Sequence, residues 1–132
     1  MRFVLTLMAA LFCATAALAK TTEISVPGGS AVYLPDSETM VLFSDVKDVR
    51  CPSTVNCVWE GMIRVELELA VPGDRPEIVV LCNACEGAAR TADYGRYTLT
   101  LLRLEPGRVV LDPLNRLEEL RDYTVILGVE WQ

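Results

Sequence analysis

The longest regular pattern in the chain is an alternation of apolar and polar residues from Val58 to Val71. Alternation with a period of two is typical of a β-strand that turns one face to a core and the other to solvent. Pro72-Gly73-Asp74 follows and predicts a hairpin turn into a second strand over 76–81. The apolar face holds Trp59, Gly61, Ile63, Val65, Leu67, Leu69 and Val71; the other face holds Glu60, Met62, Arg64, Glu66, Glu68 and Ala70.

Shorter apolar runs separated by turn residues extend this pattern to the rest of the chain. The run 39–46 is apolar on both faces, which indicates a central strand. The segment 83–95 is polar and irregular and predicts a loop, as does 45–56. Further strands are expected at 21–26, 30–34, 96–104, 109–111 and 123–131.

One short helix is expected between the last two of these strands. Asp112 followed by Pro113 is typical of a helix N-terminus, and Leu114, Leu117 and Leu120 recur at helical spacing. Many short strands with one brief helix predict an antiparallel β-sandwich or an open barrel. The alternative is an α+β fold with the helix packed on one face of a smaller sheet.

The N-terminus has the pattern of a secretory signal peptide. Arg2 precedes an apolar run over 3–18, which is short for a membrane span, and Ala17-Leu18-Ala19 is a cleavage signature. We expect cleavage after Ala19 and one domain over 20–132, in the periplasm or outside the cell. An uncleaved anchor is one alternative; a lipoprotein through Cys13 is another, although Phe12 occupies a position where a small residue is needed.

The charge balance limits the kinds of partner. The net charge is −6, and removal of Arg2 makes it one unit more negative. An acidic chain without a basic cluster is poorly suited to nucleic acid or to anionic membranes. It suits a basic exported protein, although net negative charge is also a common means of staying soluble.

Four cysteines remain after cleavage: Cys51, Cys57, Cys82 and Cys85. In an oxidising compartment an even number predicts two disulfides. The local pairs Cys51–Cys57 and Cys82–Cys85 are favoured, and a crossed pairing such as Cys57 with Cys82 stays open. Two alternatives use the same residues: thiol–disulfide chemistry at the C-x-x-C pair Cys82 and Cys85, and a zinc site of four cysteines.

The segment around the first two cysteines resembles a set of uncharacterised small bacterial exported proteins and lipoproteins. Here it reads Asp48-Val49-Arg50-Cys51-Pro52 and then Val55-Asn56-Cys57-Val58-Trp59-Glu60-Gly61, against their signature D-S-R-C-P-x-x-V-x-C-x-W-x-G. The resemblance continues more loosely into 97–106 and 122–125, and Val49 departs from it by replacing a serine. It implies a β fold, export and, because the C-x-x-C pair is not shared, a Cys51–Cys57 disulfide. It carries no catalytic or binding residue.

The same segment also has a physical interpretation as a corner motif of Asp48, Arg50, Pro52, Trp59 and Gly61. We expect a rigid disulfide-closed loop at a strand start, with Trp59 packed over the disulfide and Gly61 allowing close approach. Asp48 and Arg50 are expected to pair or to cap backbone groups, and an exposed pair would contribute only about 0–1 kcal/mol. A corner that supports the core is favoured, and a recognition loop is the alternative.

The residue types that most enzymes need are missing. The chain has no histidine, which removes Ser-His-Asp triads, Cys-His pairs and the commonest metal ligands. It contains no phosphate loop or dinucleotide motif, so we expect no cofactor and no metal. The favoured function is non-enzymatic binding of an exported protein or an envelope component. The alternatives are a thiol–disulfide redox protein and a structural accessory domain.

The cleavage site is directly testable. When the full chain is expressed in a bacterium, the exported protein should begin at Lys20, and intact-mass measurement with N-terminal sequencing reads this directly. An unprocessed mass in the membrane fraction would support the anchor instead, and a lipid adduct on Cys13 would support the lipoprotein.

Overall fold

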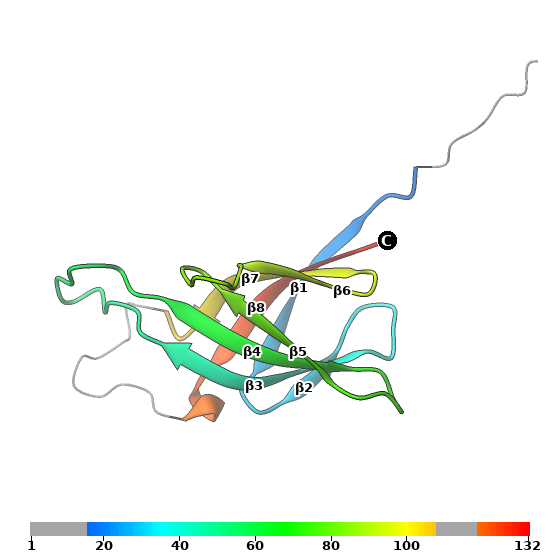
Figure 1. Ribbon diagram of the computed structural model, residues 1–132, viewed down its shortest axis with the longest axis horizontal. Coiled ribbons are helices and arrows are strands. Elements are labelled where there is room, and N and C mark those ends of the chain that lie inside the picture. Colours follow the sequence, from blue (N-terminus) through cyan, green and yellow to red (C-terminus); the bar gives the residue numbers. More distant parts are fainter. Residues whose placement is uncertain (1–15, 108–118) are drawn as a thin grey trace, which may run out of the picture.

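A computed structural model describes residues 16–107 and 119–132 of the chain, and it confirms a mainly β fold. The strands form two four-stranded antiparallel sheets (Figure 1). Sheet A has the order β1-β8-β7-β6 and sheet B the order β2-β3-β4-β5. The strands are β1 (Lys20–Pro27), β2 (Ala31–Tyr33), β3 (Met40–Asp48), β4 (Ile63–Ala70), β5 (Glu77–Cys82), β6 (Thr91–Tyr94), β7 (Tyr97–Glu105) and β8 (Thr124–Trp131).

The core lies between the two sheets. Each strand turns alternate residues inward, so that the predicted period of two appears as alternating burial, most regularly along β4. Burial of these apolar side chains is the main favourable term for a sandwich of this kind. The largest fully buried side chains are Phe43, Leu34, Leu67, Leu69, Leu81, Leu99, Leu101, Leu104 and Leu127.

Three elements differ from the sequence prediction. The loop expected over 45–56 starts later, because β3 continues to Asp48 and its last residues pair with β4. The strand expected over 58–71 begins only at Ile63, because Gly61 has a φ of 81° and interrupts the extended backbone. The loop expected over 83–95 contains a strand, β6, which pairs with β7 across a tight turn at Gly95. Four residues at a sheet edge are too few to show a reliable alternation, so the pattern did not reveal this strand.

Some predictions fall outside the described residues. They are the strand expected at 109–111 and most of the expected helix, namely its start at Asp112 and Pro113 and its apolar residues Leu114 and Leu117. Leu120 begins a 3₁₀ turn, η2 (Leu120–Asp122), and this turn is the helical element within the described part of the chain. No helix of residues 16–107 or 119–132 is long and apolar enough to cross a membrane.

A β-bulge in each sheet changes which side chains face the core. In β3 the register shifts between Phe43 and Asp45, where the Ser44 hydroxyl donates to the Glu66 carbonyl at 3.2 Å. A bulge adds one residue and thereby reverses the inward and outward positions beyond it. Val46 and Asp48 therefore turn toward the interior. An equivalent shift in β7, between Leu101 and Arg103, turns Leu104 inward.

Candidate functional site

The connection between β3 and β4 forms a closed loop at one end of the sandwich (Figure 1). The hairpin ladder continues beyond the strands, since the Val49 N–H donates to the Met62 carbonyl at 3.0 Å and the Cys51 N–H to the Glu60 carbonyl at 2.8 Å. Cys51 and Cys57 then form a disulfide, with their Cα atoms 6.0 Å apart. We call residues 52–60 the β3–β4 loop. Backbone pairing thus holds the two ends of the loop together, and the disulfide closes its first part, 51–57, into a covalent ring.

Below this loop, Asp48 and Arg50 form a bidentate ion pair. Arg50 Nε donates to Asp48 Oδ1 at 2.8 Å and Arg50 Nη2 to Asp48 Oδ2 at 2.8 Å. The Arg50 backbone N–H also donates to Oδ1 at 3.1 Å. The Asp48 and Arg50 side chains are 6% and 7% exposed. The pair is therefore buried rather than at the surface, where such a pair would contribute little.

Arg50 also joins the two sheets. Its Nη1 donates to the Leu104 carbonyl at 3.1 Å and its Nη2 to the Pro106 carbonyl at 3.0 Å, both at the end of β7 in sheet A. The hydroxyl of Tyr123, the residue directly before β8, donates to Asp48. A planar guanidinium with five donors is suited to this combination of a carboxylate and two carbonyls. The start of the β3–β4 loop is thereby fastened to the opposite sheet.

The charge of Arg50 keeps Asp48 ionised despite burial. Desolvation by itself raises the pKa of Asp48, but the hydrogen bonds and charge of Arg50, helped by the Tyr123 hydroxyl, outweigh it and lower the pKa below its usual value. A carboxyl whose pKa is lowered by folding stabilises the folded state above the unfolded-state pKa of about 3.9. That contribution is lost as the pH falls through the folded-state pKa.

Gly61 lies where the chain re-enters sheet B. Its φ of 81° is in the left-handed region, and a Cβ at this position would overlap the Val49 carbonyl oxygen and the Arg50 Cα atom. Only glycine accepts both conditions without a shift of the backbone. The two strands leading into and out of the β3–β4 loop can therefore approach each other closely at this point.

The β3–β4 loop itself presents apolar side chains to solvent. Val58 is fully exposed, Trp59 is 58% exposed and Val55 is 40% exposed. Trp59 lies outside β4 and lines a shallow open hollow of about 270 Å³ together with Cys51 and Cys57. It was expected to pack over the disulfide from a strand face; it lies beside the disulfide but remains mostly accessible. Pro52, by contrast, is buried, and its carbonyl accepts the Val55 N–H at 3.3 Å.

The second disulfide, Cys82–Cys85, supports the neighbouring crossover from sheet B to sheet A. The Asn83 side chain between the two cysteines accepts the Ile63 N–H at 2.8 Å, and the Cys82 N–H donates to the Ala89 carbonyl at 2.9 Å. Cys82 is 2% exposed and ends a strand, whereas reactive C-x-x-C thiols open a helix. In this pairing no thiol is free for zinc, and no group of three metal-ligating residues occurs within 16–107 and 119–132.

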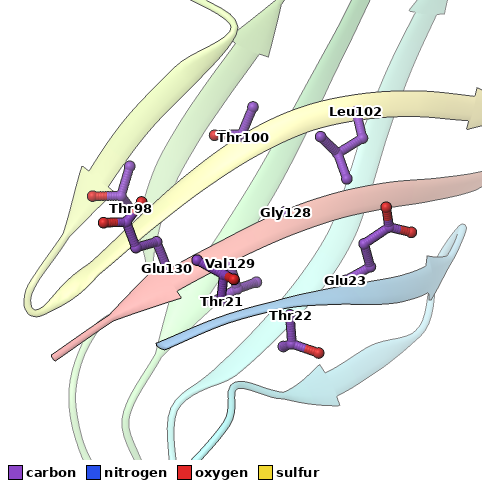
Figure 2. A pocket seen from close by; sticks show the side chains of 9 residues that line it. All are labelled: Thr21, Thr22, Glu23, Thr98, Thr100, Leu102, Gly128, Val129 and Glu130. Atoms are coloured by element: carbon purple, nitrogen blue, oxygen red, sulfur yellow. The ribbon is translucent and has the colours of Figure 1, made fainter. Parts of the chain in front are cut away.

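A groove of about 320 Å³ crosses the outer face of sheet A (Figure 2). Several of its polar groups are already engaged within the chain: Thr98 donates to Asp93 at 2.7 Å, Thr100 is bonded to Thr91 at 3.3 Å, and Glu23 pairs with Arg103. None of the residues that line it is aromatic. The groove offers little that would select a ligand.

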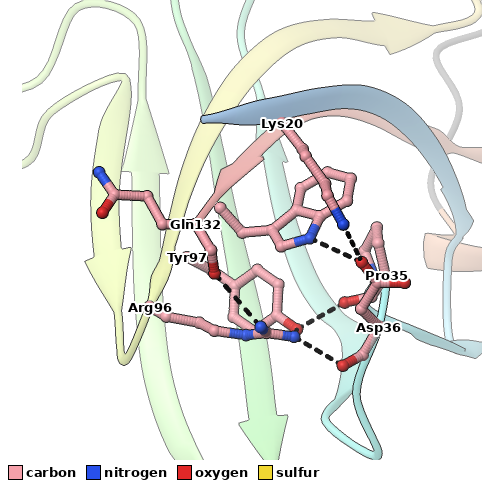
Figure 3. Close-up of polar contacts among 7 residues, drawn as sticks. Lys20, Pro35, Asp36, Arg96, Tyr97 and Gln132 are labelled. Carbon is pink, nitrogen blue, oxygen red and sulfur yellow. Dashed lines mark hydrogen bonds and ion pairs between the residues drawn. The ribbon is translucent and has the colours of Figure 1, made fainter. Parts of the chain in front are cut away.

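A polar cluster closes the opposite end of the sandwich (Figure 3). The Asp36 carboxylate accepts from Trp131 Nε1 at 3.0 Å and from Lys20 Nζ at 3.1 Å, and these donors lower the pKa of Asp36, the indole N–H first. Arg96 donates to the Asp36 carbonyl at 2.6 Å and the Tyr97 hydroxyl to the Pro35 carbonyl at 2.6 Å. This cluster ties the turn after β2 to sheet A and serves the fold.

Comparison with protein-family models, with curated proteins and with solved structures finds no match to this chain. The candidate site is therefore defined by its geometry alone. It consists of the β3–β4 loop, with its disulfide and exposed apolar side chains, and the buried Asp48–Arg50 pair next to it.

We predict that the Asp48–Arg50 pair is a major determinant of stability. Arg50→Met leaves the Asp48 carboxylate buried without its partner and should lower the free energy of unfolding by about 3–5 kcal/mol. The double variant Asp48→Leu/Arg50→Met should be less destabilised than Arg50→Met, because no charge remains buried. It should also lose less stability than the parent between about pH 4 and pH 2. Urea unfolding across this pH range measures both effects.

A second arginine–carboxylate pair provides the control for this prediction. Arg64 and Glu66 are also two residues apart and also bond at 2.8 Å, but their side chains are about one-third exposed. Arg64→Met should therefore cost less than about 1 kcal/mol. Equal costs for Arg50→Met and Arg64→Met would contradict the role assigned to the buried pair.

We predict a large difference between two glycines with similar backbone angles. Gly61→Ala and Gly73→Ala both place a side chain at positive φ, which costs about 1–2 kcal/mol. At Gly73 the Cβ meets open space, whereas at Gly61 it overlaps backbone atoms. Thermal or urea unfolding should show Gly61→Ala less stable than Gly73→Ala by at least about 2 kcal/mol. Equal stabilities would show that the close approach at Gly61 relaxes without cost.

Proposed function

We propose that this chain is an exported, non-enzymatic binding protein and that the β3–β4 loop is its contact site. The observation that carries the proposal is the exposure of Val58 and Trp59, two large apolar side chains that are neighbours in the chain and directly follow the disulfide-closed segment 51–57. Exposed apolar residues lower solubility, so a group of them in one loop is typical of an interaction site. Tryptophan in particular is enriched among residues that dominate binding energy.

The support beneath the loop favours the same function. Binding loops lose affinity when they must be ordered on contact, and a pre-organised loop avoids this cost. Here the Cys51–Cys57 disulfide, the extended backbone pairing and the buried Asp48–Arg50 pair hold the loop on the sandwich. Rigid β scaffolds that display such loops are common among binding proteins.

The setting of the proposed partner follows from the N-terminal segment, the paired cysteines and the resemblance to small exported proteins. A signal peptide and disulfides both favour an oxidising compartment outside the cytoplasm. The partner is accordingly an exported protein or an envelope component. The net charge of −6 favours a basic partner, because opposite net charges speed association.

Affinity capture tests the proposal. The exported protein, immobilised, should retain a partner from periplasmic or culture-medium extract of the source cells at low salt, and high salt should weaken the retention if the partner is basic. The double variant Val58→Ser/Trp59→Ser should lose this partner. Retention by the variant at the parent level, or no partner at low salt, would contradict the proposal.

Trp131 provides a matched control. It is the second tryptophan of the chain, it is 7% exposed, and it lies at the other end of the sandwich. Trp131→Phe should keep the partner, and its remaining tryptophan, Trp59, should show a blue-shifted emission when the partner binds. Trp59→Phe, which keeps Trp131, should show no such shift.

A further inference from the structure

The outer face of sheet B is apolar over half its length. Residues paired across strands point to the same side of a sheet, so the register defines rows on this face. One row runs Tyr33, Met40, Ala70, and the next runs Ala31, Leu42, Glu68, Ile78. These seven residues, which we call the sheet B patch, come from all four strands. Six of them are apolar and one is a carboxylate.

The patch faces away from the core. The inward residues of the same strands, such as Val41, Leu67 and Val79, belong to the core cluster, and none of the sheet B patch does. Tyr33 is 66% exposed and Ile78 is 63% exposed. The outer face of a sandwich sheet is ordinarily polar. The sequence indicated a central strand because 39–46 is apolar on both faces; β3 is central, and its outer apolar residues belong to this patch.

Glu68 lies within the patch, between Leu42 and Ile78 in the same row. It is half-buried and makes no hydrogen bond or ion pair within the described part of the chain. Glu66, two residues earlier on the same face, is paired with Arg64 at 2.8 Å. An unpaired carboxylate among apolar side chains is costly to cover unless the covering surface brings a cation.

We propose that the sheet B patch binds a protein segment that presents apolar side chains around one lysine or arginine. The apolar residues supply the contact area, and Glu68 selects the cation. A second copy of this chain fits poorly, because the patch contains no cation and would place its carboxylate against the same apolar, acidic surface. The overall charge of −6 further favours a basic partner over an acidic one.

This surface is separate from the β3–β4 loop. Leu42 and Asp48 lie six residues apart on β3, which corresponds to roughly 20 Å along a strand. The loop connects the end of β3 to the start of β4. The patch lies on the outer face at the other end of these two strands, around the start of β3 and the end of β4. The two surfaces can therefore bind independently, and the patch does not depend on the function proposed for the loop.

Synthetic peptides test the patch without knowledge of the natural partner. Three labelled peptides share one amphipathic apolar sequence and carry lysine, glutamine or glutamate at the centre. Fluorescence anisotropy should show the lysine peptide binding about tenfold more tightly than the glutamine peptide, with the glutamate peptide weakest. Glu68→Gln should remove this preference. Tyr33→Ser/Ile78→Ser should weaken all three peptides, with thermal unfolding verifying that each variant is folded.

Glu66→Gln is the matched control, because the charge of Glu66 is already compensated by Arg64. This variant should keep the lysine preference of the parent. The proposal is overturned if the parent binds the lysine peptide no more tightly than the glutamate peptide, or if Glu66→Gln acts like Glu68→Gln. Sedimentation velocity tests the alternative occupant. If the parent is a dimer and Tyr33→Ser/Ile78→Ser is a monomer, the patch binds a second copy of the chain and the proposal is overturned.

Discussion

Arg50 divides its donors between the two sheets, and the candidate site depends on this arrangement. On the sheet B side it holds the Asp48 carboxylate in a bidentate pair, and on the sheet A side it donates to the Leu104 and Pro106 carbonyls. Removing either charge leaves the other buried without compensation. The pair therefore couples the closure of the sandwich at this end to the position of the β3–β4 loop.

The two proposed contact surfaces lie at opposite ends of one hairpin. At one end the β3–β4 loop displays Val58 and Trp59 on a closed, well-supported backbone. At the other end the sheet B patch offers a flat apolar face with Glu68 unpaired within it. Loop and patch differ in shape and charge, so as proposed binding surfaces they suit different kinds of contact.

Much of the fold follows from local pattern. Alternation along 63–70 predicts the most regular strand because one face is buried and the other is not. The strand boundaries were less predictable: Gly61 delays the start of β4 to Ile63, and β6 is too short to show alternation. For the candidate site, Asp48, Arg50 and Gly61 could be identified from their spacing around Cys51, but the burial of the pair could not, because its cover comes from β7 and Tyr123, far away in the sequence.

The sequence by itself determined the β class, the strand alternation and the local spacing of the cysteines, because these depend on neighbouring residues. The tertiary structure decided which face each residue occupies and what lies over it. The bulge at Ser44 turns Asp48 inward to meet Arg50, and the sheet order leaves the apolar outer residues of β3 and Ile78 on an open face. Both results depend on strand register, which is set by contacts between segments distant along the chain.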